Sequence, residues 1–185
     1  MDREARYEKI EDLPREKLLE LLTIFAKDWL ALDGLWFQSI EQKRGMDEAM
    51  EHDANAWARF TVLEARRIKA LLGLPARAGV EGLRRALRFR LYAPLNEDEI
   101  EVAGGALTYR VTTCRVQAAR ERKGMPPHPC KSVGILEYTG FARESDDRFE
   151  VECLSCHPDR SDETCKCAWR FVLRRDEDGG AQETE

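Results

Sequence analysis

The chain has 185 residues, of which 43% are hydrophobic and 35% are charged, with a formal net charge of −5. This length fits one domain, and the apolar content is enough for a folded core. The acidic balance argues against nucleic acid and membrane partners, because both favour an excess of Lys and Arg. No run reaches the roughly 18 apolar residues of a membrane span, and the charged residues 1–6 do not resemble a secretion signal. We therefore expect a cytoplasmic protein with a small-molecule ligand.

Three helices are predicted in the first half of the chain, over residues 14–45, 47–72 and 80–91. Apolar side chains recur there at spacings of three and four, as on a helix with one buried face. Pro14 suits the start of a helix, and Gly45 and Gly73 suit helix ends. We expect the buried faces to carry Leu18, Leu22, Phe25, Trp29, Leu32, Trp36 and Ile40 in the first helix, and Met50, Trp57, Phe60, Leu63, Ile68 and Leu71 in the second.

The period of the pattern changes in the second half. Apolar and polar residues alternate over residues 107–111, 149–153 and 165–173, which predicts strands. Residues 116–123 and 133–142 read as shorter helices. The expected fold class is α+β, with N-terminal helices packed on a small antiparallel sheet in the cysteine-rich C-terminal half. Residues 1–95 form the helical part, residues 96–174 form the cysteine-rich α+β part of the same domain, and residues 175–185 are a disordered tail.

All six cysteines lie in the last 72 residues: Cys114, Cys130, Cys153, Cys156, Cys165 and Cys167. The cytoplasm keeps thiols reduced, so these residues need a use other than structural disulfides. Cys153 and Cys156 have the Cys-x-x-Cys spacing that holds one tetrahedral ion. Cys165 and Cys167 share one face of a predicted strand. If the two late strands form a hairpin, these four thiolates meet, which predicts a zinc site or alternatively an iron–sulfur cluster.

Other interpretations of the same cysteines stay open. Cys153, Cys165 and Cys167 suit a core as small apolar residues, and Cys153 with Cys156 suits a redox disulfide. The run from Cys153 to His157 also matches the c-type haem attachment pattern, although that use requires export.

Cys130 and Cys114 are the candidate catalytic thiols. Cys130 follows Pro129 and opens a predicted helix, where free N–H groups and the helix dipole lower the pKa of a thiol. It is the best candidate nucleophile, with a plain buried thiol as the alternative. Cys114 ends a strand whose alternation places it away from Leu107, Tyr109 and Val111, unless a bulge or a helix start intervenes.

Four carboxylates, Asp33, Glu41, Asp53 and Glu64, lie among aromatic residues on the long predicted helices. They suit the lining of a ligand pocket better than a two-metal site, because no Glu-x-x-His pair accompanies them. Glu64 is spaced for an ion pair with Arg67. The basic runs at residues 84–85 and 120–123 read as solvated helix faces.

A resemblance to a known family appears at particular residues. Cys114, Cys130-Lys131 and the run from Cys167 to Phe171 resemble the L-2-amino-thiazoline-4-carboxylic acid hydrolase-like family, and are similar to vinyl-reductase-type small-molecule-binding domains. Further matches over residues 28–172 are Trp29, the run 33–37, Glu41, Asp53, Trp57 and the run 64–68. The resemblance implies helices on a small sheet, a pocket near Cys114, Cys130 and Cys167, and hydrolysis of a C–N bond in a sulfur-containing ring. Cys153, Cys156 and Cys165 are additional to that pattern.

The resulting hypothesis is a cytoplasmic small-molecule enzyme, a hydrolase acting on a C–N bond. Either a metal held by Cys153, Cys156, Cys165 and Cys167 activates water, or Cys130 attacks the substrate directly. The alternative is a non-enzymatic small-molecule or redox sensor with a structural four-cysteine zinc or iron–sulfur site.

Overall fold

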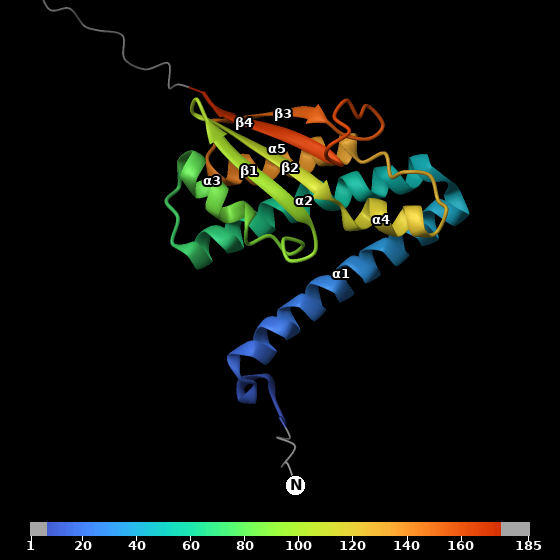
Figure 1. Ribbon diagram of the computed structural model, residues 1–185, viewed down its shortest axis with the longest axis horizontal. Helices are drawn as coiled ribbons and strands as arrows, with labels where there is room; N and C mark the ends of the chain where they lie inside the picture. Colours follow the sequence, from blue (N-terminus) through green and yellow to red (C-terminus); the bar gives the residue numbers. More distant parts are fainter. Residues whose placement is uncertain (1–6, 175–185) are drawn as a thin grey trace, which may run out of the picture.

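The computed structural model describes residues 7–174 and confirms the α+β fold (Figure 1). The predicted tail at residues 175–185 lies outside the described residues. The elements in chain order are a 3-10 helix Ile10–Asp12, α1 Arg15–Arg44, α2 Met46–Leu72, α3 Gly79–Leu87, β1 Glu97–Ala103, β2 Ala106–Thr113, α4 Arg115–Arg122, α5 Lys131–Ser145, β3 Phe149–Ser155 and β4 Cys167–Leu173.

The four strands form one antiparallel sheet in the order β1-β2-β4-β3, and the expected hairpin pairing of β3 with β4 is confirmed. The inner face of the sheet is the core, with Leu107, Tyr109, Phe149, Trp169 and Phe171 almost fully buried. The sequence analysis did not predict β1. This edge strand pairs with β2 alone, and its acidic residues lack the apolar alternation of a strand with one buried face.

Helices α5 and α2 cover the inner face of the sheet, with α5 against β3 and α2 against α5 (Figure 1). Two glycines permit this close packing. A Cβ at Gly134 would lie 2.6 Å from the ring of Trp169, and one at Gly140 would lie 2.6 Å from Thr61 Cγ2. Since real Cβ atoms do not approach this closely, both positions require glycine for the observed packing.

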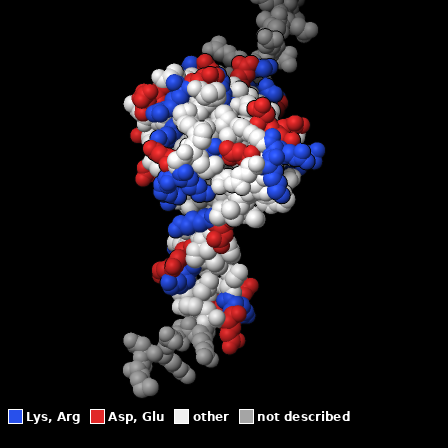
Figure 2. All heavy atoms as spheres, turned by 90° about the vertical axis from the view of Figure 1, so that its right-hand side faces the viewer, with Lys and Arg blue, Asp and Glu red and all other residues white. Residues whose placement is uncertain are grey.

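The N-terminal part of α1 extends beyond the body of the molecule, and its C-terminal part packs on α2 (Figure 1). The predicted inward stripe of α1 is therefore wrong in part, because Leu22, Leu32 and Trp36 are 60%, 59% and 67% exposed. On α2, Leu63 and Leu71 are also exposed, whereas Thr61 and Glu64 are buried. Figure 2 shows basic and acidic side chains interspersed over one side of the body and along α1.

Two predicted boundaries shift. β4 begins at Cys167, so Cys165 lies in the turn before the strand rather than in it. Helix α3 ends at Leu87, and the chain then makes turns up to β1. None of the helices in residues 7–174 combines the length and apolar character needed to cross a membrane.

Candidate functional site

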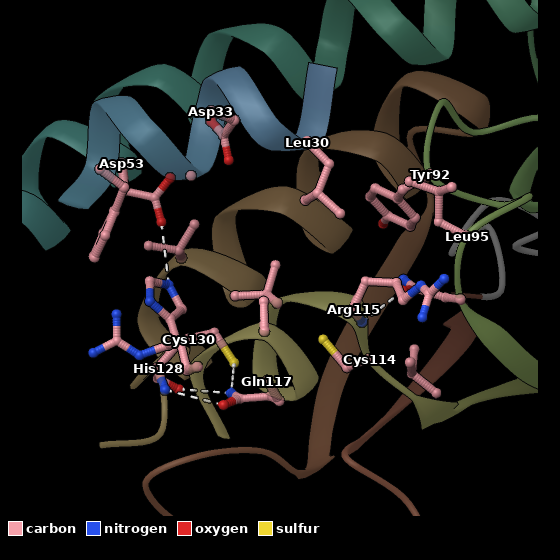
Figure 3. A pocket seen from close by; sticks show the side chains of 18 of the residues that line it. Leu30, Asp33, Asp53, Tyr92, Leu95, Cys114, Arg115, Gln117, His128 and Cys130 are labelled. Carbon is pink, nitrogen blue, oxygen red and sulfur yellow. Dashed lines mark hydrogen bonds and ion pairs between the residues drawn. The ribbon is translucent and has the colours of Figure 1, made fainter. Parts of the chain in front are cut away.

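A cavity of about 570 Å³ lies between α1, α2, α4, α5 and the start of β4 (Figure 3). Its apolar and aromatic walls include Trp29, Leu30, Phe37, Trp57, Tyr92, Leu95, Val133, Tyr138 and Trp169. Its polar lining includes Asp33, Asp53, Cys114, Arg115, Gln117, His128, Cys130, Glu137, Cys156 and Cys167. Apolar walls with a few convergent polar groups are typical of a small-molecule site.

Cys130 occupies the N-cap position of α5, as the sequence analysis predicted, and its thiol lines the cavity. The side-chain amide of Gln117 donates to Cys130 Sγ at 3.6 Å, and Cys156 Sγ lies 3.5 Å from the same sulfur. The hydrogen bond from Cys156 lowers the pKa of Cys130 to about 7, against the opposing effect of burial, with smaller contributions from His128 and Gln117. A substantial fraction of Cys130 is therefore thiolate at neutral pH.

His128 stands beside Cys130 in the loop that precedes α5. Its Nε2 lies 3.4 Å from Asp53 Oδ2 on α2, and its ring meets Phe37 edge to face. The side chain of Gln117 fixes the backbone of His128, accepting from its N–H at 3.0 Å and donating to its carbonyl at 2.9 Å. Figure 3 shows Asp53, His128, Gln117 and Cys130 as neighbours along one wall of the cavity. A protonated His128 therefore places a positive charge near the Cys130 thiolate.

The loop carrying His128 is held by a buried ion pair. Arg120 on α4 donates to both Glu41 oxygens on α1, at 2.9 and 2.8 Å, and to the carbonyl of Pro126 at 2.6 Å. Arg120 is buried, so the prediction of a solvated face at residues 120–123 is wrong for this residue. Glu41 is a structural partner of Arg120, whereas Asp53 lines the cavity.

Asp33 is a carboxylate directed into the cavity (Figure 3). It forms no hydrogen bond or ion pair with another residue in the described range 7–174. Burial and the nearby Asp53 carboxylate raise the pKa of Asp33 to about 6. Asp33 is thus a polar group that a ligand can satisfy.

Behind the cavity lies a buried charge network. Arg90 donates to Glu64 Oε2 at 2.9 and 2.8 Å and to Glu137 Oε1 at 2.6 Å, while the Tyr92 hydroxyl donates to the same Glu137 oxygen. The predicted ion pair of Glu64 with Arg67 is wrong, because Glu64 faces the interior and meets Arg90. Burial raises the pKa of Glu137, with Arg90 opposing the rise.

The cysteines gather in a different combination from the predicted metal ligands. Cys156 Sγ lies 3.5 Å from Cys130 Sγ, and both residues line the cavity together with Cys167 and Cys114. A helix start does intervene at Cys114, which is the N-cap of α4, and burial raises the pKa of its thiol to about 11. Cys114 lines the cavity, and its catalytic role stays a prediction.

Cys153 and Cys165 do not line the cavity. Cys165 interacts with Asp162 in the turn before β4, and burial raises the pKa of the Cys153 thiol on β3. Among residues 7–174, no three His, Cys, Asp or Glu side chains form a group that could hold a metal ion. The zinc and iron–sulfur assignments to Cys153, Cys156, Cys165 and Cys167 stay predictions.

Sequence reasoning missed Gln117 and Glu137 as site residues and gave His128 no role. Gln117 lies one helical turn after Cys114, and His128 lies two residues before Cys130 in a proline-rich loop. These two spacings are the only local signals in the sequence, and neither predicts that Gln117 contacts His128 and Cys130.

Comparison with known proteins gives one match. A family model described as a family of unknown function (DUF6125) matches residues 11–173. No curated protein and no solved structure matches the chain. Because the matched region covers most of its length, the chain belongs to the DUF6125 family.

Proposed function

We propose that this protein is a cytoplasmic, thiol-dependent small-molecule enzyme, a hydrolase that cleaves a C–N bond with Cys130 as its nucleophile. The observation that carries the proposal is the position of Cys130 Sγ on the cavity wall, with Gln117, Cys156 and His128 stabilising its thiolate. A nucleophile activated by neighbouring donors and located in a ligand-sized cavity is the usual arrangement for covalent catalysis.

The reaction follows from these groups. The Cys130 thiolate attacks an electrophilic carbon bonded to nitrogen, and the C–N bond breaks as the nitrogen takes a proton, which a protonated His128 can supply. Water then attacks the carbon of the covalent intermediate, and the C–S bond breaks to return the thiolate. Asp53, whose Oδ2 lies 3.4 Å from His128 Nε2, holds the imidazole ring in place. Asp33, which has no hydrogen-bond or ion-pair partner within residues 7–174, accepts a hydrogen bond from the substrate.

The resemblance to the L-2-amino-thiazoline-4-carboxylic acid hydrolase-like family supports the same reaction class. Cys114, Cys130 and Cys167 are the positions that carry over from that resemblance, and all three line the cavity. The ring-opening substrate of that family is therefore the first compound to test. The alternative mechanism uses a metal ion, but no group of three side chains that could bind one is found among residues 7–174. Elemental analysis of the purified protein tests that mechanism separately.

Two compounds test the proposal: L-2-amino-thiazoline-4-carboxylate, and 4-nitrophenyl acetate as a general acyl donor. We expect the wild-type chain to hydrolyse both, and Cys130→Ala to lose about 1000-fold or more in kcat/KM. Cys165→Ser, which alters a buried thiol away from the cavity, should retain the activity. Hydrolysis of the ester alone would support Cys130 as a nucleophile, but it would reject the ring substrate and would not support cleavage of a C–N bond.

Two results would contradict the proposed function. If Cys130→Ala hydrolyses these compounds as fast as the wild-type chain, Cys130 is not the nucleophile. Should neither compound react while purified protein holds about one zinc per chain, the non-enzymatic sensor with a structural metal becomes the better account.

A further inference from the structure

We infer that Cys130 and Cys156 form a reversible disulfide when a hydroperoxide enters the cavity, with Cys156 as the resolving thiol. The two sulfurs are 3.5 Å apart and come from different parts of the fold, the N-cap of α5 and the residue directly after β3. A disulfide needs about 2.05 Å between its sulfurs. The pair is therefore within about 1.5 Å of bonding distance, a gap that side-chain rotation and small backbone shifts can close.

The backbone around the pair keeps the two thiols together. The N–H of Lys131, the residue after Cys130, donates to the carbonyl of His157, the residue after Cys156, at 2.9 Å. The ammonium group of Lys131 also pairs with Asp159 at 2.8 Å, and Asp159 forms a β-bridge with Cys156. These contacts tie the first turn of α5 to the loop after β3, so little chain ordering is required for the sulfurs to join.

The two thiols differ in access and in ionisation. Both residues line the cavity, but Cys130 is half-buried whereas Cys156 is almost fully buried. The hydrogen bond with Cys130 raises the pKa of Cys156, just as it lowers that of Cys130. Because the thiolate is the species that reacts with peroxide, Cys130 is oxidised first and Cys156 follows as its partner.

The chemistry balances with a hydroperoxide as the oxidant. The Cys130 thiolate attacks one peroxide oxygen, the O–O bond breaks, and an alcohol or water leaves as Cys130 becomes a sulfenic acid. The Cys156 thiol then attacks the sulfenic sulfur, the S–O bond breaks, and water leaves as the disulfide forms. The two thiols are oxidised by two electrons and the peroxide is reduced. A dithiol reductant reverses the change.

The Cys-x-x-Cys spacing suggested a different redox pair, Cys153 with Cys156. In the structure the thiol of Cys156 lies 3.5 Å from the thiol of Cys130. Cys153 lies opposite Trp169 in the β3–β4 register, and a register shift separates it from Ser155. The oxidation product thus links α5 to the sheet. With its sulfur in a disulfide, Cys130 has no thiolate for catalysis, so peroxide would switch the proposed enzyme off.

Disulfide mapping of the full chain tests this inference and needs no substrate, so it is independent of the proposed hydrolysis. After treatment with hydrogen peroxide, tryptic peptides of the wild-type chain should contain Cys130 linked to Cys156. Cys167→Ser should keep this linkage, which excludes exchange with the neighbouring thiol. Cys156→Ser should lose it and leave a sulfenic acid at Cys130 that dimedone traps. Cys153→Ser and Cys165→Ser serve as matched controls and should retain the linkage.

Three results would overturn the inference. One is a Cys153–Cys156 linkage as the main product in the wild-type chain. Another is irreversible sulfinic acid at Cys130 without any disulfide, which would mean that Cys156 does not reach it in time. The third is an unchanged yield of dimedone adduct in the Cys156→Ser variant. Circular dichroism of each variant verifies that the comparison is made between folded proteins.

Discussion

Asp33 lies in the cavity at a cost to stability, and replacing it by Asn removes that cost. Its pKa rises from an ordinary 3.8 to about 6 because burial and the Asp53 carboxylate disfavour the charged form. A pKa rise of this size corresponds to a destabilisation of the folded state by about 3 kcal/mol at neutral pH. We therefore expect Asp33→Asn to raise the free energy of unfolding at pH 7.5 by up to about 3 kcal/mol.

The pH dependence of the stability gained by Asp33→Asn tests whether the gain comes from the charge of Asp33. A carboxyl with a raised pKa in the folded state contributes its full stability below pH 3.8 and loses it as the pH rises through about 6. The gain from Asp33→Asn should therefore be largest above pH 6 and fade toward pH 4. Urea denaturation at pH 4 and pH 7.5 measures both values. Asp28→Asn, at an exposed position on the same helix, is the control and should change little.

The reasoning would be refuted if Asp33→Asn gave no gain at pH 7.5, or a gain of the same size at both pH values. The first result would mean that a group on the protein already satisfies the carboxylate. The second would mean that the effect comes from packing rather than from charge.

Two further substitutions test the structure around the site. Gly134→Ala should destabilise the protein by about 1–3 kcal/mol, because its Cβ would lie 2.6 Å from the Trp169 ring. Gly34→Ala, whose Cβ has ordinary room, should be neutral or stabilising in the same denaturation assay, and equal effects of the two would contradict the packing. Glu64→Gln should cost about 3–5 kcal/mol, since it leaves Arg90 buried without one of its two carboxylate partners. A loss below about 1 kcal/mol on thermal or urea unfolding would show that Glu137 alone compensates the charge.

Much of the fold was predictable because periodicity reports local structure. The spacing of apolar residues located α1, α2, α4 and α5, and alternation located β2, β3 and β4. The exposure of Trp36 was not predictable in this way, because a stripe on a helix indicates a face but not whether another element covers it. β1 was missed because it is an exposed edge strand with little apolar alternation to detect.

The site was predictable only in part. Cys130 at a helix start follows from Pro129 and the pattern after it, and this prediction is confirmed. The grouping of Cys156 with Cys130 and Cys167 depends on α5 lying against the end of the β3–β4 hairpin. No spacing along the chain encodes that contact, so the sequence favoured Cys153 and Cys165 as partners instead. The role of Gln117 likewise depends on how α4 is placed against the loop before α5.

The most direct test of the central claim is the pH dependence of Cys130 alkylation by iodoacetamide, followed on the peptide that contains Cys130. The structure predicts a rate that rises with a midpoint near pH 7, because Cys156 and His128 stabilise the thiolate. His128→Gln should move this midpoint upward. A midpoint near 9.0, the ordinary value for a thiol, would contradict the claim that this cavity holds an activated nucleophile.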